Sequence, residues 1–381
     1  MTGTPGLTAR RRAVGIAAAV AGLIGAVAIA IAGVAIPAAA APSTSAGPTT
    51  LTSVNAVSCA SAARCWAGAS DAKGAAIVAT ADGGAAWRVQ YTTTRFDDIV
   101  AIDCTSVARC VAIGYESNGS GAAFLETTDG GKAWSVHAAP KSLALAQALS
   151  CANGSDCWAV GLAGNRSQAA VARTTDGGRD WASQSIPKLQ TAMSSPFGIA
   201  CTSSSRCLVT GEGTLTTLNG GKTWARHATP GGAPLGPVTC PSANDCYAAF
   251  NVTSAVPSNT ESFIFTSANG GVSWRQVLAG PRHVAALDGV SCPSTTTCVA
   301  AGIGYTPRKN GAYTLYGLSE LTSTSGRHWA QTTVGKAQGL FAVSCVARTR
   351  DCIAGGGTSA GVILKSANDG ATWTSVPLPR A

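Results

Sequence analysis

Between residues 54 and 378, the chain repeats the same order of short apolar runs and polar turns seven times. Each unit places a pair of cysteines between two apolar runs of strand length, followed by a hydroxyl–x–Asp/Asn–Gly–Gly–x–x–Trp turn. The first cysteines of successive units are 39 to 53 residues apart. A repeat of this length, with strand-sized segments and glycine-rich turns, is typical of a four-stranded propeller blade. The pattern predicts an all-β chain that forms a single seven-bladed β-propeller of four-stranded antiparallel blades.

The first 41 residues follow a different pattern. Three arginines, Arg10 to Arg12, precede an uncharged run of 24 residues from Ala13 to Ile36, and small residues with A-x-A character follow. This order is typical of an export signal, although the run is also long enough for a membrane-spanning helix. We expect a signal peptide or membrane anchor at 1–41 and a Ser/Thr/Pro linker at 42–53. The propeller would then occupy 54–381, with blades that start near residues 54, 99, 146, 196, 235, 287 and 340.

The 14 cysteines form seven pairs with none left over. In an exported protein such pairing predicts structural disulfides, each joining the first two strands of its own blade. The alternative is metal binding, which usually needs closer cysteine spacing and suitably placed histidines. The four histidines are not placed in that way, so we expect no metal and no cofactor. The expected disulfides are Cys59–Cys65, Cys104–Cys110, Cys151–Cys157, Cys201–Cys207, Cys240–Cys246, Cys292–Cys298 and Cys345–Cys352.

The recurring turn has the features of a structural element. Its acidic position is Asp in three units and Asn in three others, so the side chain keeps a hydrogen-bond acceptor but loses its charge. Such a side chain accepts backbone N–H groups within a turn, and glycine permits positive φ. The closing Trp is expected to bury its ring between adjacent sheets. The positions concerned are Asp82, Asp129, Asp176, Asn219, Asn269 and Asn368, with Trp87, Trp134, Trp181, Trp224, Trp274, Trp329 and Trp373.

The turn reads Thr80-x-Asp82-Gly-Gly84-x-x-Trp87 in the first unit. It resembles the Asp-box, or bacterial neuraminidase repeat, of sialidases, some glucan hydrolases and sortilin-type receptors. The fuller unit, with Cys/Trp-Ala-x-Gly ahead of the turn, is similar to the photosystem II stability/assembly factor family, which has exported relatives in non-photosynthetic bacteria. The resemblance covers about residues 54–378 and implies a seven-bladed propeller. It says little about function, because the shared residues are those that build blades.

Two long loops are the candidate binding region. They span 250–261 in the fifth unit and 304–313 in the sixth, and loops on rigid scaffolds are common binding sites. Aromatic and basic side chains there would suit stacking on sugars or contact with an acidic partner. An ordinary hairpin extension in solvent is the alternative interpretation. The candidate residues are Tyr305, Arg308, Lys309, Tyr313, Tyr316 and Glu261.

The sequence favours binding over catalysis. A glycosidase needs two carboxylates that converge over one site, and nothing pairs the candidates Asp97, Asp98, Glu116, Glu212, Glu261 and Asp288. The net charge of +9 is scattered, without the basic stripe of a nucleic-acid-binding protein. We expect a secreted or envelope-associated, monomeric, non-enzymatic propeller that binds a protein or glycan. It would contact a membrane only through an uncleaved N-terminal segment. The alternative is a sialidase-like or glucanase-like glycoside hydrolase on the same scaffold.

Overall fold

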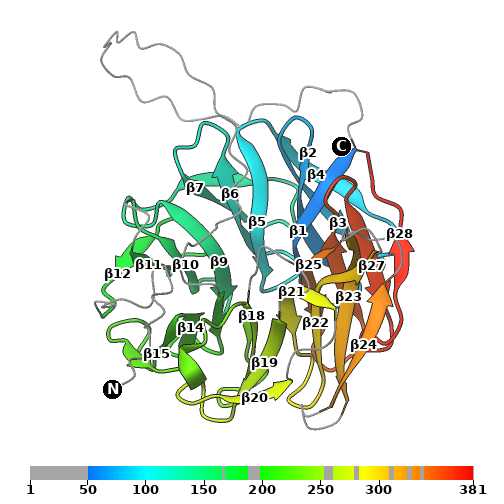
Figure 1. Cartoon of the computed structure of the whole chain (residues 1–381). Coiled ribbons are helices and arrows are strands. Elements are labelled where there is room, and N and C mark those ends of the chain that lie inside the picture. The colour runs from blue at the N-terminus through cyan, green and yellow to red at the C-terminus, as the bar shows by residue number, and fades with distance from the viewer. Residues whose placement is uncertain are drawn as a thin grey trace, which may run out of the picture. The chain divides into compact units, whose positions relative to one another are not determined.

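The computed structural model describes residues 50–164, 168–187, 198–252, 261–278, 283–308, 313–323, 328–334 and 339–380. The expected signal segment and most of the expected linker lie outside these residues. The described strands form seven four-stranded antiparallel sheets. Figure 1 shows the sheets following one another around a common centre in chain order. The prediction of a seven-bladed propeller with four-stranded blades is therefore confirmed.

Each sheet takes its strands in the order of the chain, from the centre of the ring outwards. Blades 1 to 4 comprise β1 (Leu51–Cys59), β2 (Cys65–Asp71), β3 (Ala75–Thr80), β4 (Arg88–Thr93); β5 (Phe96–Cys104), β6 (Cys110–Glu116), β7 (Ala122–Thr127), β8 (Ser135–Ala138); β9 (Leu145–Cys151), β10 (Cys157–Leu162), β11 (Ala169–Thr174), β12 (Ala182–Gln184); and β13 (Gly198–Cys201), β14 (Cys207–Gly211), β15 (Gly213–Thr217), β16 (Ala225–His227). Blades 5 to 7 comprise a short 3-10 helix, η1 (Pro230–Gly232), with β17 (Val238–Thr239), β18 (Cys246–Val252), β19 (Glu261–Ser267), β20 (Arg275–Leu278); β21 (Val284–Ser291), β22 (Cys298–Pro307), β23 (Tyr313–Ser323), β24 (His328–Val334); and β25 (Leu340–Cys345), β26 (Cys352–Gly356), β27 (Val362–Ser366), β28 (Thr374–Val376). No helix among the described residues is long and apolar enough to cross a membrane.

The burial of the strands explains their apolar patterns. In blade 1 every residue of β3 is buried, whereas β4 at the outer edge contains no buried residue. A strand covered on both faces reads as a continuous apolar run, and an edge strand tolerates polar residues. The two middle strands of each blade therefore carry the strongest sequence signal.

Seven clusters of buried side chains lie at the seven interfaces between neighbouring blades. In each cluster the closing Trp of one blade packs against the preceding blade. Trp181 of blade 3, for example, stacks on Phe124 of blade 2 with ring centroids 3.9 Å apart. The core is thus divided among seven equivalent seams, and the turn tryptophans help to hold each seam together.

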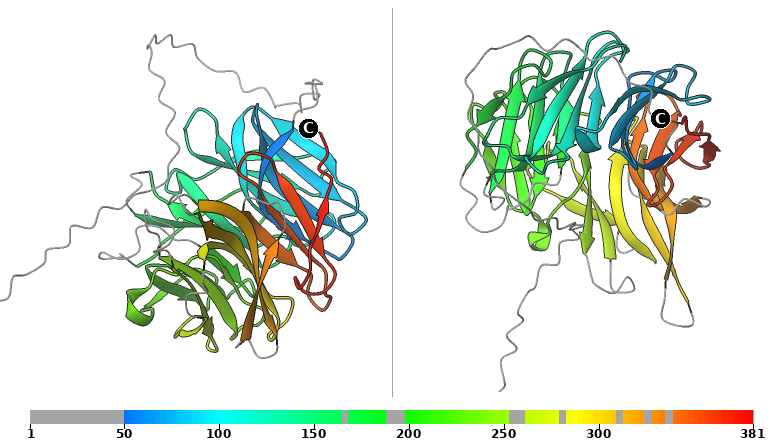
Figure 2. Two further views of the ribbon diagram at one scale, coloured as in Figure 1. Left: turned by 45° about the vertical axis from the view of Figure 1, so that its right-hand side comes forward. Right: turned by 90° about the horizontal axis from the view of Figure 1, so that it is seen from above.

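The ring closes without strand exchange, a point on which the sequence is silent. Blade 1 and blade 7 each hold four consecutive strands, and β28 lies beside the first blade in Figures 1 and 2. Backbone N–H groups of the described residues donate across this seam: Cys59 N–H donates to Ser344 Oγ over 3.0 Å, and Gly361 N–H donates to the Leu51 carbonyl over 2.9 Å. Packing and these bonds, rather than a shared sheet, join the two ends of the propeller.

All seven expected disulfides are present, and each joins the first and second strands of one blade. No cysteine is free among the described residues. Closing a loop of this size contributes about 2 kcal/mol per bond in the chain-entropy model. Disulfides in this number are typical of proteins that fold in an oxidising, extracytoplasmic compartment.

A chain of side-chain hydrogen bonds links neighbouring blades beside the disulfides. The residue before the first cysteine of one blade accepts the N–H of the first cysteine in a neighbouring blade, over 2.7 to 3.0 Å. The acceptor is always a Ser hydroxyl or an Asp carboxylate directly before the first cysteine. This recurring polar residue is therefore visible in the sequence, although its partner in the neighbouring blade is not. The five pairs are Ser58–Cys104, Asp103–Cys151, Ser150–Cys201, Ser291–Cys345 and Ser344–Cys59.

The recurring turn is held by its own side chains. In blade 1 the Thr80 hydroxyl donates to Asp82 Oδ1 over 2.7 Å, while Gly84 N–H donates to Thr80 Oγ1 and Ala86 N–H donates to Asp82 Oδ1. These hydrogen bonds lower the pKa of Asp82. The first glycine of the turn has φ 69°, and Asp369 takes this left-handed position in blade 7 with φ 59°. The carboxylate therefore acts as a hydrogen-bond acceptor inside the turn.

Turns that carry Asn contain one additional hydrogen bond. The Asn Nδ2 donates to a hydroxyl four residues later, over 2.7 to 2.9 Å. Where Asp stands instead, that later residue is Ala86, Ala133 or Asp180, which have no hydroxyl. The extra donor of Asn is thus matched by an extra acceptor in Asn219–Thr223, Asn269–Ser273 and Asn368–Thr372.

The Asp/Asn position of the turn and the position four residues later should therefore be coupled in their effect on the free energy of unfolding. Asp129→Asn is expected to cost about 0.5–1 kcal/mol on its own, because its new Nδ2 faces Ala133, and Ala133→Thr should restore that loss. Urea unfolding of the two single variants and the double variant measures the coupling. Asn219→Asp with Thr223→Ala is the reciprocal control. Strictly additive free energies in both blades would contradict the pairing.

Candidate functional site

The first strands of all seven blades surround a cavity of about 610 Å³. Because every blade contributes to its wall, this cavity is the central channel of the propeller. Most of the described lining residues are apolar, and Phe341 is the only aromatic residue among them. The polar side chains of this described lining are Asn55, Gln147, Asn251 and Asp288.

Several of the channel side chains stand at β-bulges. In five blades the residue four positions before the first cysteine is skipped in the pairing between the first and second strands. A bulge re-aims a side chain and is common next to functional sites. The five residues, all of which line the channel, are Asn55, Val100, Gln147, Asp288 and Phe341.

Asn251 fixes the backbone beside one of these bulges. Its Nδ2 donates to the Leu287 carbonyl over 3.0 Å, and Leu287 N–H donates to its Oδ1 over 2.9 Å. The side-chain amide thereby replaces a backbone partner for β21, one residue before Asp288. This pair of bonds from blade 5 to blade 6 positions the Asp288 carboxyl at the channel wall.

Asp288 is the one charged side chain among the described residues that line the channel. Partial burial among apolar channel residues raises the pKa of Asp288 to about 7, and its carboxylate accepts no hydrogen bond from the described residues to oppose that rise. Gln147 Oε1 is buried without a hydrogen-bond partner in the described part of the chain. The channel therefore holds polar groups that the fold itself does not satisfy.

Unlike Gln147 Oε1, the side-chain NH2 group of Asn55 is already hydrogen-bonded within the fold. Its Nδ2 donates to Asp98 Oδ1 over 2.6 Å and to Ser53 Oγ over 2.8 Å. Burial raises the pKa of Asp98, and the hydrogen bond from Asn55 opposes that rise. Asp98 and Asn55 therefore form a polar bridge between blades 1 and 2.

The carboxylates considered for catalysis do not converge on the channel in the described part of the chain. Asp98 is bonded to Asn55, and Glu116 forms an ion pair with Arg95 at 2.8 Å. Glu261 begins β19, and its side chain is not described. Two-carboxylate glycoside hydrolysis needs a second acid near Asp288, and the described lining holds none. No group of three or more potential metal ligands occurs among the described residues.

The predicted binding loop of blade 6 is largely a hairpin, because β22 runs to Pro307 and β23 starts at Tyr313. Tyr305 is only 4% exposed and makes an edge contact with His283 at 5.3 Å between ring centroids. Tyr316 is half-buried and packs on the cluster between blades 5 and 6. Both rings thus pack largely in the blade interior.

The remaining predicted residues are spread over the hairpin and its neighbour. Arg308 is exposed, and its Nε donates to Thr314 Oγ1 over 2.6 Å. Tyr313 lies at the start of β23 without a described side chain, and Lys309 lies outside the described residues. Much of the blade 5 loop, 253–260, also lies outside them. The structure does not bring the predicted binding residues together as one described site.

No protein-family model matches the chain, and neither does any curated protein. Among solved structures, YCF48 bound to D1 peptide has a TM-score of 0.57 at 15% identity, over 86% of this chain and 97% of that one. YCF48 from Cyanidioschyzon merolae has a TM-score of 0.57 at 13% identity, over 84% and 96%. The GH74 enzyme of Niastella koreensis has a TM-score of 0.51 at 12% identity, over 86% and 66%. At these identities the similarity establishes the propeller fold alone.

Proposed function

We propose that this chain is an exported, non-catalytic propeller that binds a partner protein at the cell envelope, and that its central channel receives a segment of the partner. The observation that carries the proposal is the channel wall, where bulged residues present the Gln147 amide and the Asp288 carboxyl to a largely apolar cavity. Apolar walls with a few oriented polar groups are typical of ligand sites.

A protein segment suits this channel better than a glycan. Sugar binding relies on aromatic faces together with many hydrogen-bonding groups, whereas the described lining offers Phe341 and four polar side chains. An unpaired amide oxygen and a carboxylate can accept hydrogen bonds from backbone N–H groups or side-chain donors. YCF48, which has the same fold, has been solved with a bound peptide. The disulfides support an extracytoplasmic location.

The test compares two tryptophan substitutions in the full, disulfide-bonded chain. Gln147→Trp places a large ring at a bulge that faces the channel. Val107→Trp alters an exposed turn position, 51% exposed, beside the Cys104–Cys110 disulfide. Peptides selected from a display library on the unchanged chain are expected to bind the Val107 variant equally and the Gln147 variant at least about tenfold more weakly.

Equal binding by both variants would refute the channel as the binding site. Fluorogenic sialosides and glucosides test the hydrolase alternative in the same samples. Turnover by the unchanged chain that is lost in Asp288→Asn would replace the binding proposal with a catalytic one.

A further inference from the structure

The seam between blades 3 and 4 contains an arginine from the chain itself. Arg173, the residue of β11 that pairs with Trp158, donates through one terminal nitrogen to Asp156 Oδ1 at 2.5 Å and through the other to the Gly220 carbonyl at 2.8 Å. Its guanidinium also lies 4.6 Å from the centroid of the Trp158 ring. The seam thus offers a guanidinium three partners: a carboxylate, a turn carbonyl and an apolar floor.

The seam between blades 7 and 1 repeats this arrangement without the arginine. Asp351 precedes the second cysteine of blade 7 as Asp156 does in blade 3, and Ile353 takes the place of Trp158. Gly83 is the first glycine of the turn in blade 1, as Gly220 is in blade 4. The residue that pairs with Ile353, equivalent to Arg173, is Lys365.

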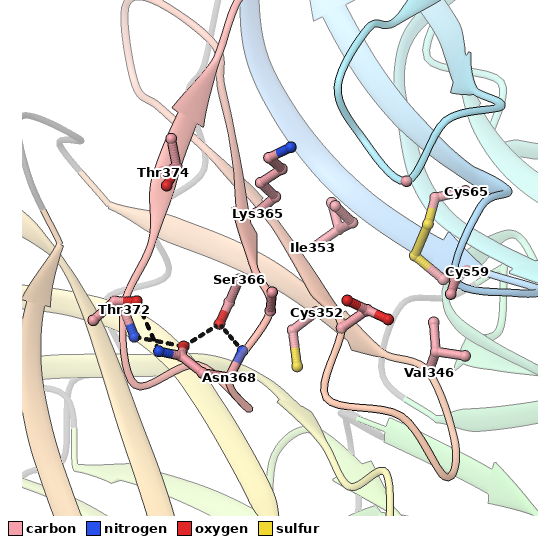
Figure 3. Close-up of a pocket in the computed structure, with 14 residues that line it drawn as sticks. Cys59, Cys65, Val346, Cys352, Ile353, Lys365, Ser366, Asn368, Thr372 and Thr374 are labelled. Atoms are coloured by element: carbon pink, nitrogen blue, oxygen red, sulfur yellow. Dashed lines mark hydrogen bonds between the residues drawn. A yellow bond between two sulfur atoms is a disulfide. The ribbon is translucent and has the colours of Figure 1, made fainter.

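This second seam is open. A cavity of about 340 Å³ is lined by Gly83, Asp351, Ile353 and Lys365, among other residues. Figure 3 shows Lys365 and Ile353 between the hydrogen-bonded group of Ser366, Asn368 and Thr372 on one side and the Cys59–Cys65 disulfide on the other. Within the described residues, Asp351 and Lys365 form no ion pair with each other or with another side chain, in contrast to Arg173 and Asp156.

We propose that the seam between blades 7 and 1 is a binding pocket for an arginine side chain of a partner protein. The guanidinium takes the position that Arg173 occupies in the other seam, donating to the Asp351 carboxylate and to the Gly83 carbonyl while it lies on Ile353. Arginine fits better than lysine because its planar fork reaches two acceptors at once. This pocket is separate from the central channel, so the inference does not depend on the channel proposal.

Because the chain carries Lys365 and not an arginine at this position, it does not fill the pocket with a guanidinium of its own. The Lys365 ammonium is a single point donor, whereas Arg173 satisfies two acceptors at the equivalent position of blade 3. Lys365→Arg gives the chain its own guanidinium at the seam. That variant is expected to lose the pocket and to unfold at a higher temperature than the unchanged chain.

The experiment titrates the full, disulfide-bonded chain with Nα-acetyl-L-arginine amide and, separately, with Nα-acetyl-L-lysine amide, followed by amide NMR shifts and calorimetry. The arginine probe is expected to bind at least about tenfold more tightly than the lysine probe and to shift the Gly83 amide. Asp351→Asn should weaken the arginine probe at least about tenfold, because the charged acceptor is lost. Lys365→Arg should abolish its binding.

Asp245→Asn is the matched control. Asp245 precedes the second cysteine of blade 5, and its carboxylate accepts the Ser242 hydroxyl at 2.7 Å, away from the proposed pocket. This variant should bind the arginine probe as the unchanged chain does, and its melting temperature reports on any general loss of fold. Equal affinity for the two probes, no binding at millimolar concentration, or binding that survives Asp351→Asn would each overturn the proposal.

Discussion

Replacement of Trp158 by alanine is expected to lower the free energy of unfolding by about 4 kcal/mol. The ring is completely buried at the interface of blades 3 and 4, in a cluster with Val160, Leu215 and Trp224. Its removal leaves a cavity that two rigid sheets cannot close, and it also removes the floor beneath Arg173. The loss should therefore exceed the transfer free energy of the side chain alone.

Urea unfolding monitored by circular dichroism measures this loss, and Trp134→Ala is the matched control. Trp134 is a half-buried turn tryptophan that packs on the cluster between blades 1 and 2. Because solvent already reaches part of its ring, its removal should cost about half as much. A cost below about 1 kcal/mol for Trp158→Ala would show that the seams can collapse around a missing ring.

Replacement of Asp288 by asparagine is expected to stabilise the protein by about 2 kcal/mol at pH 8 and to leave it unchanged at pH 4. The folded-state pKa of Asp288 is raised to about 7 from the ordinary value of 3.8. As pH rises from 4 to 7, the unfolded chain releases this proton first, so ionisation progressively destabilises the folded state. The full shift corresponds to about 4 kcal/mol, and water in the channel should reduce it by about half.

Thermal and urea unfolding between pH 4 and pH 8 provide the measurement. Asp129→Asn is the control of opposite sign, because hydrogen bonds within its turn lower the pKa of Asp129. The stabilising effect of the Asp129 charge is present above its unfolded pKa and is lost as pH falls through the folded one. An unchanged free energy of unfolding for Asp288→Asn at pH 8 would show that water in the channel fully solvates the carboxylate and that its pKa is not raised.

The blades could be predicted from the sequence because their signals are local. A buried middle strand shows as an apolar run, a turn shows as glycine and Asx, and a disulfide within one hairpin shows as two cysteines at a fixed spacing. The expected signal peptide or membrane anchor stays a prediction, since residues 1–41 lie outside the described part of the chain.

The channel could not be predicted in the same way because its residues meet only after the ring has closed. Gln147 and Asp288 belong to different blades, and each is exposed to the channel by a bulge that the apolar pattern does not show. Their common position, four residues before the first cysteine, was available in the sequence as a shared offset. Loop length instead directed attention to Tyr305, which the structure buries.

The separation of the sheets at the seam between blades 7 and 1 has a further consequence. Since no sheet borrows a strand from the other end of the chain, the termini could be moved to any other junction between blades without cutting a sheet. A whole blade could likewise be duplicated or deleted as one contiguous piece of sequence. Each junction between blades is then a place at which the chain could begin with every sheet intact.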